Sequence, residues 1–258
     1  MTERFIDYYD SMSSPWTYLG HVRFMDLAHR FGLTVRHKPM DLLKVWSVSG
    51  GLPLKQRAQQ RQAYRHQELR RWSEILKIPC NLEPAFHPVA DRRACYLVIA
   101  AMRRGLDWSK LSHAILRAVW VEDRNIADHA TLIAIANENG MDGKALLAGT
   151  EDKTVHAEYQ SNTDEAMKIG VFGAPTYVFD GELFWGQDRL QMLEWRLTQK
   201  LGAPKTTSGE PAVRKRLSDL GQVIPPPEQL TPEALAAYHK AEIDKWWPLV
   251  RAAGIKVE

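Results

Sequence analysis

Apolar residues near the start of the chain change from strand-like to helical spacing and back. Residues 4–9 are rich in aromatic and β-branched side chains, which favours a strand. From Tyr18 to Ala28 the apolar residues recur at helical spacing, and Gly32 is placed to end that helix. Residues 33–39 are strand-like again. A strand, a helix and a second strand joined in this way predict a βαβ unit with parallel strands.

The middle of the chain, from Pro53 to about Leu147, has mostly helical periodicity that proline and glycine interrupt. The clearest helices are predicted at residues 91–104, 109–119 and 127–139, with a further one at 155–167. Strand-like runs return at Thr176–Phe179 and Leu183–Trp185. Because Asp180-Gly181 lies between them, these runs predict a β-hairpin.

An amphipathic helix is predicted at residues 188–201, so the chain begins as βαβ and closes as ββα. We therefore expect an α/β domain at residues 1–203, with a helical insertion at about residues 53–168. Residues 204–258 contain a linker rich in proline, glycine, serine and threonine. Thr231-Pro232-Glu233 then has the capping chemistry of a last helix. We expect this accessory helix to dock on the domain or at a dimer interface.

Composition and charge exclude several classes of protein. The 258 residues are 45% hydrophobic and 25% charged, as in globular domains. The net charge of +3 is too small and too scattered for nucleic-acid binding. No segment has the pattern of a membrane span or of a secretory leader, and we expect no bound metal. Cys80 and Cys95 form no Cys-x-x-Cys, which indicates two small buried side chains in a reducing compartment, so we expect a cytoplasmic protein.

Ser14 is the first candidate for chemistry. It precedes Pro15 at the predicted start of the first helix, where a serine hydroxyl caps the helix by accepting a backbone N–H. That structural role is enough to explain a serine there. The functional alternative is that the hydroxyl donates to a bound thiolate, helped by the positive end of the helix dipole. Such surroundings lower the pKa of a thiol.

The second candidate is Ala174-Pro175, at the start of a predicted strand. A cis X–Pro bond there leaves the backbone of Ala174 to pair with an extended peptide, and an ordinary trans proline is the alternative. Asp188 is the N-cap of the following helix or, alternatively, the partner of a ligand ammonium group. In the second case the N-terminus of that helix holds a carboxylate. Both groups occur at the γ-glutamyl end of glutathione.

Two motifs, one at each end of this domain, carry a resemblance to a known family. They read DYY…SPWTYLG over residues 7–20 and GVFGAPT…FWGQDR over residues 170–189. Together they resemble the 2-hydroxychromene-2-carboxylate isomerase family, which is related to kappa-class glutathione transferases and bacterial disulfide-bond oxidoreductases. The resemblance covers roughly residues 4–201. It implies an enzyme with a thioredoxin-like fold, a helical insertion, bound glutathione and a homodimeric state.

The resemblance also implies the roles of single residues. Ser14 orients or activates the glutathione sulfur, and the backbone of Ala174 pairs with the glutathione cysteine. The γ-glutamyl segment contacts Trp185, Gly186, Gln187 and Asp188. Ser14 is preferred over Ser11 and Ser13 because it alone precedes a proline. Ser14 and Thr17 stand at both positions of the oxidoreductases' Cys-x-x-Cys, so no thiol is left there for disulfide exchange.

Candidate substrate residues are less sharply defined. Lys55 and Gln56 fall in a loop that makes polar contacts with ligand or substrate in the family. Lys44 is a cation for a substrate carboxylate or an exposed lysine, and His87 lines the pocket or is a surface or core histidine. Basic residues are densest at residues 55–71, which indicates a solvated helix face or, alternatively, the rim of a site for an anionic ligand.

Three functions follow from these observations. The first is a glutathione-dependent isomerase of aromatic catabolism that acts on a small aromatic or conjugated carboxylate. The second is a kappa-like glutathione transferase that consumes glutathione on an electrophile, and the third is a non-catalytic thioredoxin-like binding module. Residues 230–256 resemble the terminal helix of tripartite tricarboxylate-transporter solute receptors, without any of the binding core of those receptors.

Overall fold

The computed structural model describes residues 4–204 and, farther along, residues 236–238, 240–241 and 243–245. The chain divides into two compact units after Lys205, and each is described by itself. The described residues of the second unit are helical, as predicted. The linker, the ends of this helix and the rest of the receptor-like segment lie outside the described residues, so their role stays a prediction.

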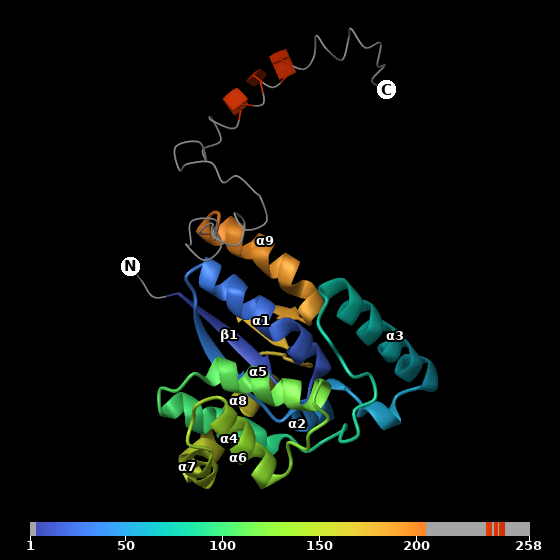
Figure 1. Cartoon of the computed structure of the whole chain (residues 1–258), viewed down its shortest axis with the longest axis vertical. Coiled ribbons are helices and arrows are strands. Elements are labelled where there is room, and N and C mark those ends of the chain that lie inside the picture. Colours follow the sequence, from blue (N-terminus) through green and yellow to red (C-terminus); the bar gives the residue numbers. More distant parts are fainter. Residues whose placement is uncertain (1–3, 205–235, 239, 242, 246–258) are drawn as a thin grey trace. The chain divides into compact units, whose positions relative to one another are not determined.

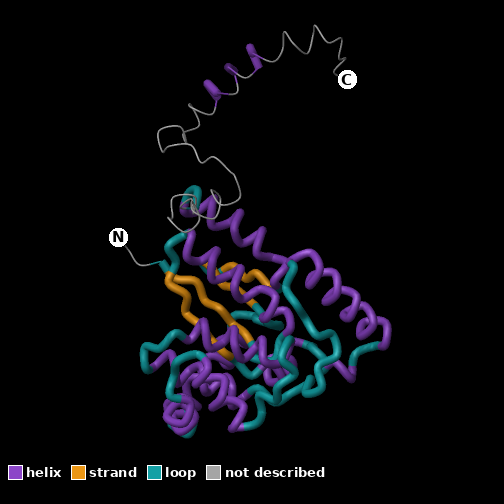
Figure 2. The backbone as a smooth tube through the Cα atoms, in the orientation of Figure 1, coloured by secondary structure: helices purple, strands orange, loops and turns teal. Residues whose placement is uncertain are grey.

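A four-stranded mixed sheet forms the centre of the first unit (Figures 1 and 2). Its strands are β1 Phe5–Asp10, β2 Thr34–Pro39, β3 Thr176–Phe179 and β4 Glu182–Trp185, in the spatial order β2-β1-β3-β4. β1 and β2 are parallel, and β3 is antiparallel to both of its neighbours. Asp180 (φ 53°) and Gly181 (φ 78°) form the two-residue turn between β3 and β4. The predicted βαβ unit and hairpin are both confirmed.

Most helices lie between β2 and β3 in the chain. The helices are α1 Pro15–Arg30, α2 Leu42–Ser49, α3 Gln59–Leu76, α4 Arg92–Arg103, α5 Trp108–Trp120, α6 His129–Glu138, α7 Gly143–Gly149, α8 Lys153–Lys168 and α9 Leu190–Leu201, with short 3₁₀ turns η1 Leu54–Gln56 and η2 Gln187–Arg189. α2 lies before the insertion expected at about residues 53–168 and was not predicted, and the bounds of that insertion stay a prediction. Asp41 caps α2 by accepting a hydrogen bond from the amide of Lys44 (3.1 Å), and a helix of eight residues is too short to show clear periodicity.

Both faces of the sheet are covered. α1 and α9 pack on one face, against a core that includes Tyr8 and Phe24. α2 and α8 lie against the other face, where Tyr9 and Val45 belong to a separate buried cluster. Tyr8 and Tyr9 are adjacent in β1 and pack on opposite faces of the sheet because side chains alternate along a strand. β1 is therefore a buried interior strand, and its carboxyl end leads directly into the candidate site.

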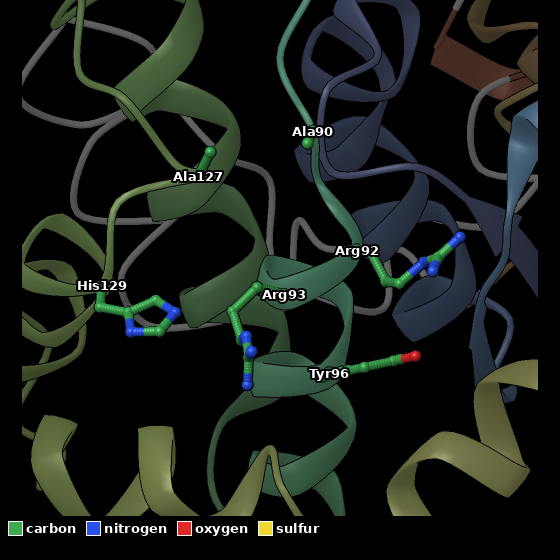
Figure 3. A pocket seen from close by; sticks show the side chains of 6 residues that line it. All are labelled: Ala90, Arg92, Arg93, Tyr96, Ala127 and His129. Atoms are coloured by element: carbon green, nitrogen blue, oxygen red, sulfur yellow. The ribbon is translucent and has the colours of Figure 1, made fainter.

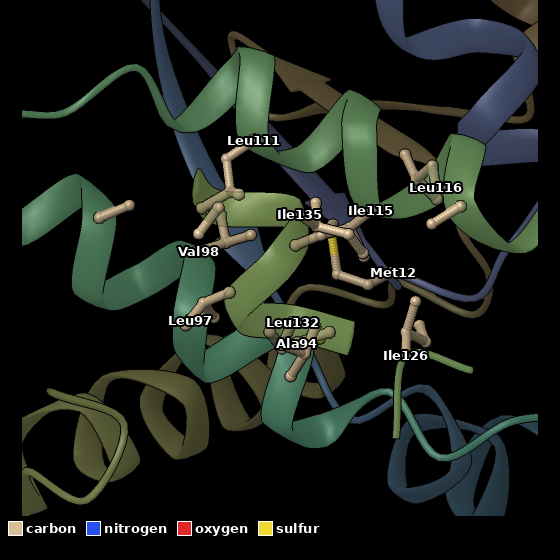
Figure 4. Packing of buried hydrophobic residues seen from close by; sticks show 14 of the residues in the cluster. Met12, Ala94, Leu97, Val98, Leu111, Ile115, Leu116, Ile126, Leu132 and Ile135 are labelled. Atoms are coloured by element: carbon tan, nitrogen blue, oxygen red, sulfur yellow. The ribbon is translucent and has the colours of Figure 1, made fainter. Parts of the chain in front are cut away.

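The helical insertion has a core of its own, in which α4, α5 and α6 pack together (Figure 4). Met12, from the segment between β1 and α1, belongs to the same cluster, which joins the insertion to the sheet. His21 of α1 reinforces this junction, with ring nitrogens 3.2 Å from the Tyr8 hydroxyl and 3.0 Å from the Ser109 carbonyl oxygen. Burial lowers the pKa of His21 to about 3, so its ring is neutral at pH 7. Within the described residues, no helix has the length and apolar character that a membrane crossing requires.

Candidate functional site

Ser14 lies where β1 ends and α1 begins, and it is 7% exposed. Its hydroxyl oxygen accepts a hydrogen bond from the amide of Thr17 (3.2 Å), which confirms the predicted N-cap. The same hydroxyl donates to the carbonyl oxygen of Ala174 (3.3 Å), 160 residues away in sequence. A serine hydroxyl has a single hydrogen to donate, so this donor points out of the helix and away from the capping bond. Ser14 and Ala174, predicted separately, are therefore brought together.

The Ala174-Pro175 peptide bond is cis, so the cis alternative is the one that forms. Pro175 precedes β3, and its carbonyl oxygen accepts a hydrogen bond from the amide of Gly186 (2.9 Å). That bond holds the chain after β4 beside the proline turn. In the described part of the protein, no group accepts a hydrogen bond from the Ala174 amide. This backbone segment thus has the free donor that an extended peptide needs for pairing.

Trp185 lies beside the same backbone. The residue is 49% exposed, and its ring packs against Phe172, with 4.6 Å between ring centroids. A Cβ atom on Gly173 would lie only 2.7 Å from Cε2 of Trp185 and would overlap Nε1. Glycine at position 173 therefore lets the indole lie across the peptide next to Ala174. The result is an exposed aromatic wall beside the unpaired amide.

Gln187 and Asp188 differ in their surroundings. Gln187 is 1% exposed, and its side-chain oxygen accepts a hydrogen bond from Arg23 (2.6 Å), so this side chain faces the protein. Asp188 lies in η2, contacts the guanidinium of Arg189 and keeps its carboxylate at the surface. α9 begins later, at Leu190, without a side-chain cap. The N-cap alternative for Asp188 is therefore wrong, because a 3₁₀ turn precedes the helix.

A family model for the DSBA-like thioredoxin domain matches residues 5–198. The chain belongs to the DSBA-like thioredoxin domain family. The match spans the sheet, the helical insertion and most of α9, and it ends before the second unit. The thioredoxin-like fold that the two terminal motifs implied is confirmed.

Curated relatives support the more specific resemblance. A 2-hydroxychromene-2-carboxylate isomerase of Pseudomonas putida is 30% identical over 192 residues, which are 73% of this chain and 92% of the relative. Glutathione S-transferase kappa 1 of Rattus norvegicus is 22% identical over 213 residues, 78% of this chain and 94% of the relative. A solved 2-hydroxychromene-2-carboxylate isomerase shares the fold, with a TM-score of 0.63 and 24% identity over 84% of this chain and 98% of the other.

In this DSBA-like domain the other two serines before α1, Ser11 and Ser13, donate hydrogen bonds to a carboxylate. This carboxylate belongs to Asp91, the residue before α4. Its Oδ2 accepts hydrogen bonds from the Ser11 hydroxyl (2.6 Å), the Ser13 amide (3.1 Å) and the Ser13 hydroxyl (3.1 Å). Burial outweighs these bonds and raises the pKa of Asp91. Asp91 thereby ties the helical insertion to the segment that positions Ser14, and only Ser14 directs its hydroxyl to Ala174.

Asp91→Ala is expected to lower the free energy of unfolding by about 2 kcal/mol or more, because three donors lose their acceptor. Asp91→Asn is expected to stay close to the wild type, since its amide oxygen can occupy the position of Oδ2. Urea unfolding of the three proteins measures both effects. Equal midpoints for Asp91→Ala and the wild type would show that the carboxylate does not hold this segment.

The candidate substrate residues are more scattered. Nζ of Lys44 in α2 pairs with Asp164 of α8 (2.9 Å), so its charge has a partner. Lys55 lies on the surface in η1, and Gln56 lies beside it. His87 packs on the ring of Trp120, with 4.7 Å between centroids. Within the described residues, no hydrogen bond or ion pair joins any of these four to Ser14 or Ala174.

Asp91 and Arg65 are the structural features that sequence reasoning missed. Asp91 lies at the start of a correctly predicted helix, where an acidic residue is ordinary, so nothing in the sequence marked its serine partners. Arg65 had a readable signal. With Leu69, Trp72 and Leu76 it completes a stripe at helical spacing, and the three apolar members pack on the core of the insertion. An arginine within such a stripe is an exception that periodicity can reveal.

Proposed function

We propose that this protein is a glutathione-dependent isomerase of the 2-hydroxychromene-2-carboxylate isomerase type. The observation that carries the proposal is the Ser14 hydroxyl at the N-terminus of α1, directed at the carbonyl of Ala174 beside a cis proline. A thiolate at this place is stabilised by the hydroxyl and by the positive end of the helix dipole. The isomerase and kappa-transferase relatives give the same site its chemical context.

The residues around Ser14 suit a γ-glutamyl tripeptide. The free amide of Ala174 pairs with the cysteinyl backbone, as an added strand does. Trp185 and Gly186 flank the γ-glutamyl segment. The Asp188 carboxylate, which pairs with Arg189 in the free protein, binds the ammonium group of that segment instead. Gln187 supports this turn from within through its bond to Arg23.

When bound, glutathione supplies a nucleophilic sulfur that adds to a conjugated substrate and is released unchanged. The work of this chain is to hold that sulfur ionised and in place. The Ser14 hydroxyl turns from Ala174 to the sulfur, while the amide of Thr17 keeps the serine oxygen fixed. Because the catalytic charge is on the sulfur, a donor rather than a base is what the site needs. We further propose a homodimer in the cytoplasm, where reduced glutathione is available.

A kappa-like glutathione transferase is the second candidate, and the 22% identity to the rat kappa enzyme over 94% of its length favours it. Both functions need the same thiolate, so only the fate of glutathione separates them. A non-catalytic thioredoxin-like module, the third hypothesis, needs no thiolate.

Calorimetric titration with glutathione, combined with thiolate absorbance near neutral pH, tests the shared requirement. Saturable binding with a thiolate signal is expected, and S-methylglutathione is the control that binds without one. Incubation with 2-hydroxychromene-2-carboxylate should then yield its trans isomer with total glutathione unchanged. Consumption of glutathione would favour the transferase, and absence of binding at millimolar glutathione would leave the non-catalytic module.

A further inference from the structure

Arg65 of α3 is a buried cation for which the described part of the chain supplies no counter-charge. It is 9% exposed, whereas most of the other charged residues of α3 are exposed. Among the described residues, no carboxylate forms an ion pair with its guanidinium and no group accepts a hydrogen bond from it. Burial of an unpaired charge is costly, so proteins normally supply a partner. The five N–H donors of this arginine are available to an anion that is not part of the chain.

The surroundings of Arg65 carry positive charge and aromatic surface. Its guanidinium lies over the ring of Trp120, 5.7 Å from the centroid, and the ring of His87 packs on the same tryptophan. Burial and the like charge of Arg57 lower the pKa of Arg65 to about 10, so it stays protonated at pH 7. His87 has a pKa of about 4 and Cys80 has a pKa of about 11, so both side chains are neutral at pH 7. Among the residues that the structure describes, no carboxylate forms an ion pair with Arg57 or Arg65.

Other arginines of the insertion provide a contrast. Arg92 donates to Asp41 (3.0 Å), and Arg93 contacts Glu151 and Thr150. These two arginines border a surface hollow of about 300 Å³ at the start of α4 (Figure 3). Because acidic side chains already neutralise the charges there, that hollow has no unpaired arginine that could attract an anion. Arg65 is an arginine of that unpaired kind.

Residues 79–81 connect Trp120, whose ring lies under Arg65, to the helix that begins at the candidate site. The amide of Asn81 donates to the carbonyl of Trp120 (2.6 Å), and the Tyr18 hydroxyl donates to the carbonyl of Pro79 (2.9 Å). Tyr18 is one helical turn beyond Ser14, whose carbonyl accepts its amide hydrogen (3.0 Å). α3 also contacts α1 directly, and Figure 1 shows α3 on the side where β1 ends. These contacts link the tryptophan beneath Arg65 to the first turn of the helix that Ser14 caps.

We propose that Arg65 binds the carboxylate of a planar, conjugated substrate, with Arg57 as a second cation. A guanidinium that rests on an aromatic ring by one face offers its edge to a carboxylate in a bidentate arrangement. This assignment rests on the proposed function and names the residue that holds the carboxylate of its substrate. It also favours the second interpretation of the basic run at residues 55–71, in which the one inward-facing arginine binds the anion and the exposed ones form its rim.

Benzoate and its uncharged analogue benzamide test the carboxylate site without any turnover. Calorimetry is expected to show benzoate binding to the wild type and to Arg70→Met, which removes an exposed arginine of the same helix. Arg65→Met should weaken benzoate binding by roughly 10- to 100-fold, the loss expected for a charged hydrogen-bonded pair. Arg65→Lys should keep part of the affinity, and benzamide should bind to none of the proteins. A melting curve of each variant verifies that it is folded.

Kinetics with 2-hydroxychromene-2-carboxylate give a second readout. Because a carboxylate contact is made in both the ground state and the transition state, Arg65→Met should raise KM by a similar factor and leave kcat nearly unchanged. Equal benzoate affinity of Arg65→Met and the wild type, or no benzoate binding by the wild type, would overturn the proposal.

Glutathione itself carries a glycyl carboxylate, so its affinity is measured for each variant. Unchanged glutathione binding by Arg65→Met is expected. Weaker binding of glutathione, with no change for glutathione amidated at its glycine, would assign Arg65 to the cofactor and overturn the substrate role. If the wild type binds no glutathione, the proposed function fails, while the benzoate comparison still decides whether Arg65 is an anion site.

Discussion

Ser14→Ala is expected to lower kcat for isomerisation by about 100-fold or more, the cost of removing one donor to a developing or resident anion. The methyl side chain of alanine offers nothing to the sulfur that the Ser14 hydroxyl would otherwise stabilise. The pKa of bound glutathione should rise accordingly, since one of the groups that favour its thiolate is gone. Thiolate absorbance as a function of pH measures this directly and is independent of the substrate.

The same substitution also removes the N-cap of α1, which costs about 1 kcal/mol of stability. Ser14→Thr is the conservative variant, which keeps both the cap and the hydroxyl and should retain the stability and the thiolate absorbance of the wild type. Ser13→Ala is the matched control, since the Ser13 hydroxyl bonds to Asp91 and not to Ala174. If Ser14→Ala keeps the thiolate absorbance and the kcat of the wild type, Ser14 is a structural cap only.

The parts of the fold that could be predicted are those whose signals are local. Ser14-Pro15 marks the start of α1, and Asp180-Gly181 marks a turn whose two positive φ angles suit these residues. Strand β3 was predicted at the bounds that it has, Thr176–Phe179. Each of these features depends on neighbours within a few residues, which a single sequence contains.

Features that depend on distant partners could not be predicted in the same way. The acceptor of the Ser14 hydroxyl is 160 residues away, and the serine partners of Asp91 are 80 and 78 residues before it. Lys44 was a candidate for a substrate carboxylate because its partner, Asp164 of α8, cannot be identified from spacing. A residue's charge is visible in the sequence, but whether the fold neutralises that charge is not. That distinction separates Lys44 from Arg65.

Gly173→Ala is expected to weaken glutathione binding by roughly 10- to 100-fold, the effect of losing one or two backbone and aromatic contacts, without unfolding the protein. The added Cβ would overlap the indole of Trp185, which lies only 2.7 Å away at Cε2. Because Trp185 is 49% exposed, its ring can swing into solvent instead of straining the sheet. The backbone of Ala174 then loses the aromatic wall beside which we place the γ-glutamyl segment. Calorimetry with glutathione measures the loss.

A double-mutant cycle with Trp185→Ala tests whether the ring is the cause. In the Trp185→Ala background the methyl group introduced at position 173 has no indole to displace, so Gly173→Ala should add little further loss, and the two effects should be strongly non-additive. Gly149→Ala is the control, because its Cβ would meet the flexible end of Arg104 (3.0 Å) in the helical insertion. Additive losses would mean that the methyl group itself obstructs the ligand. If Gly173→Ala binds glutathione with the affinity of the wild type, glutathione lies away from this backbone. That result would contradict the pairing proposed for Ala174.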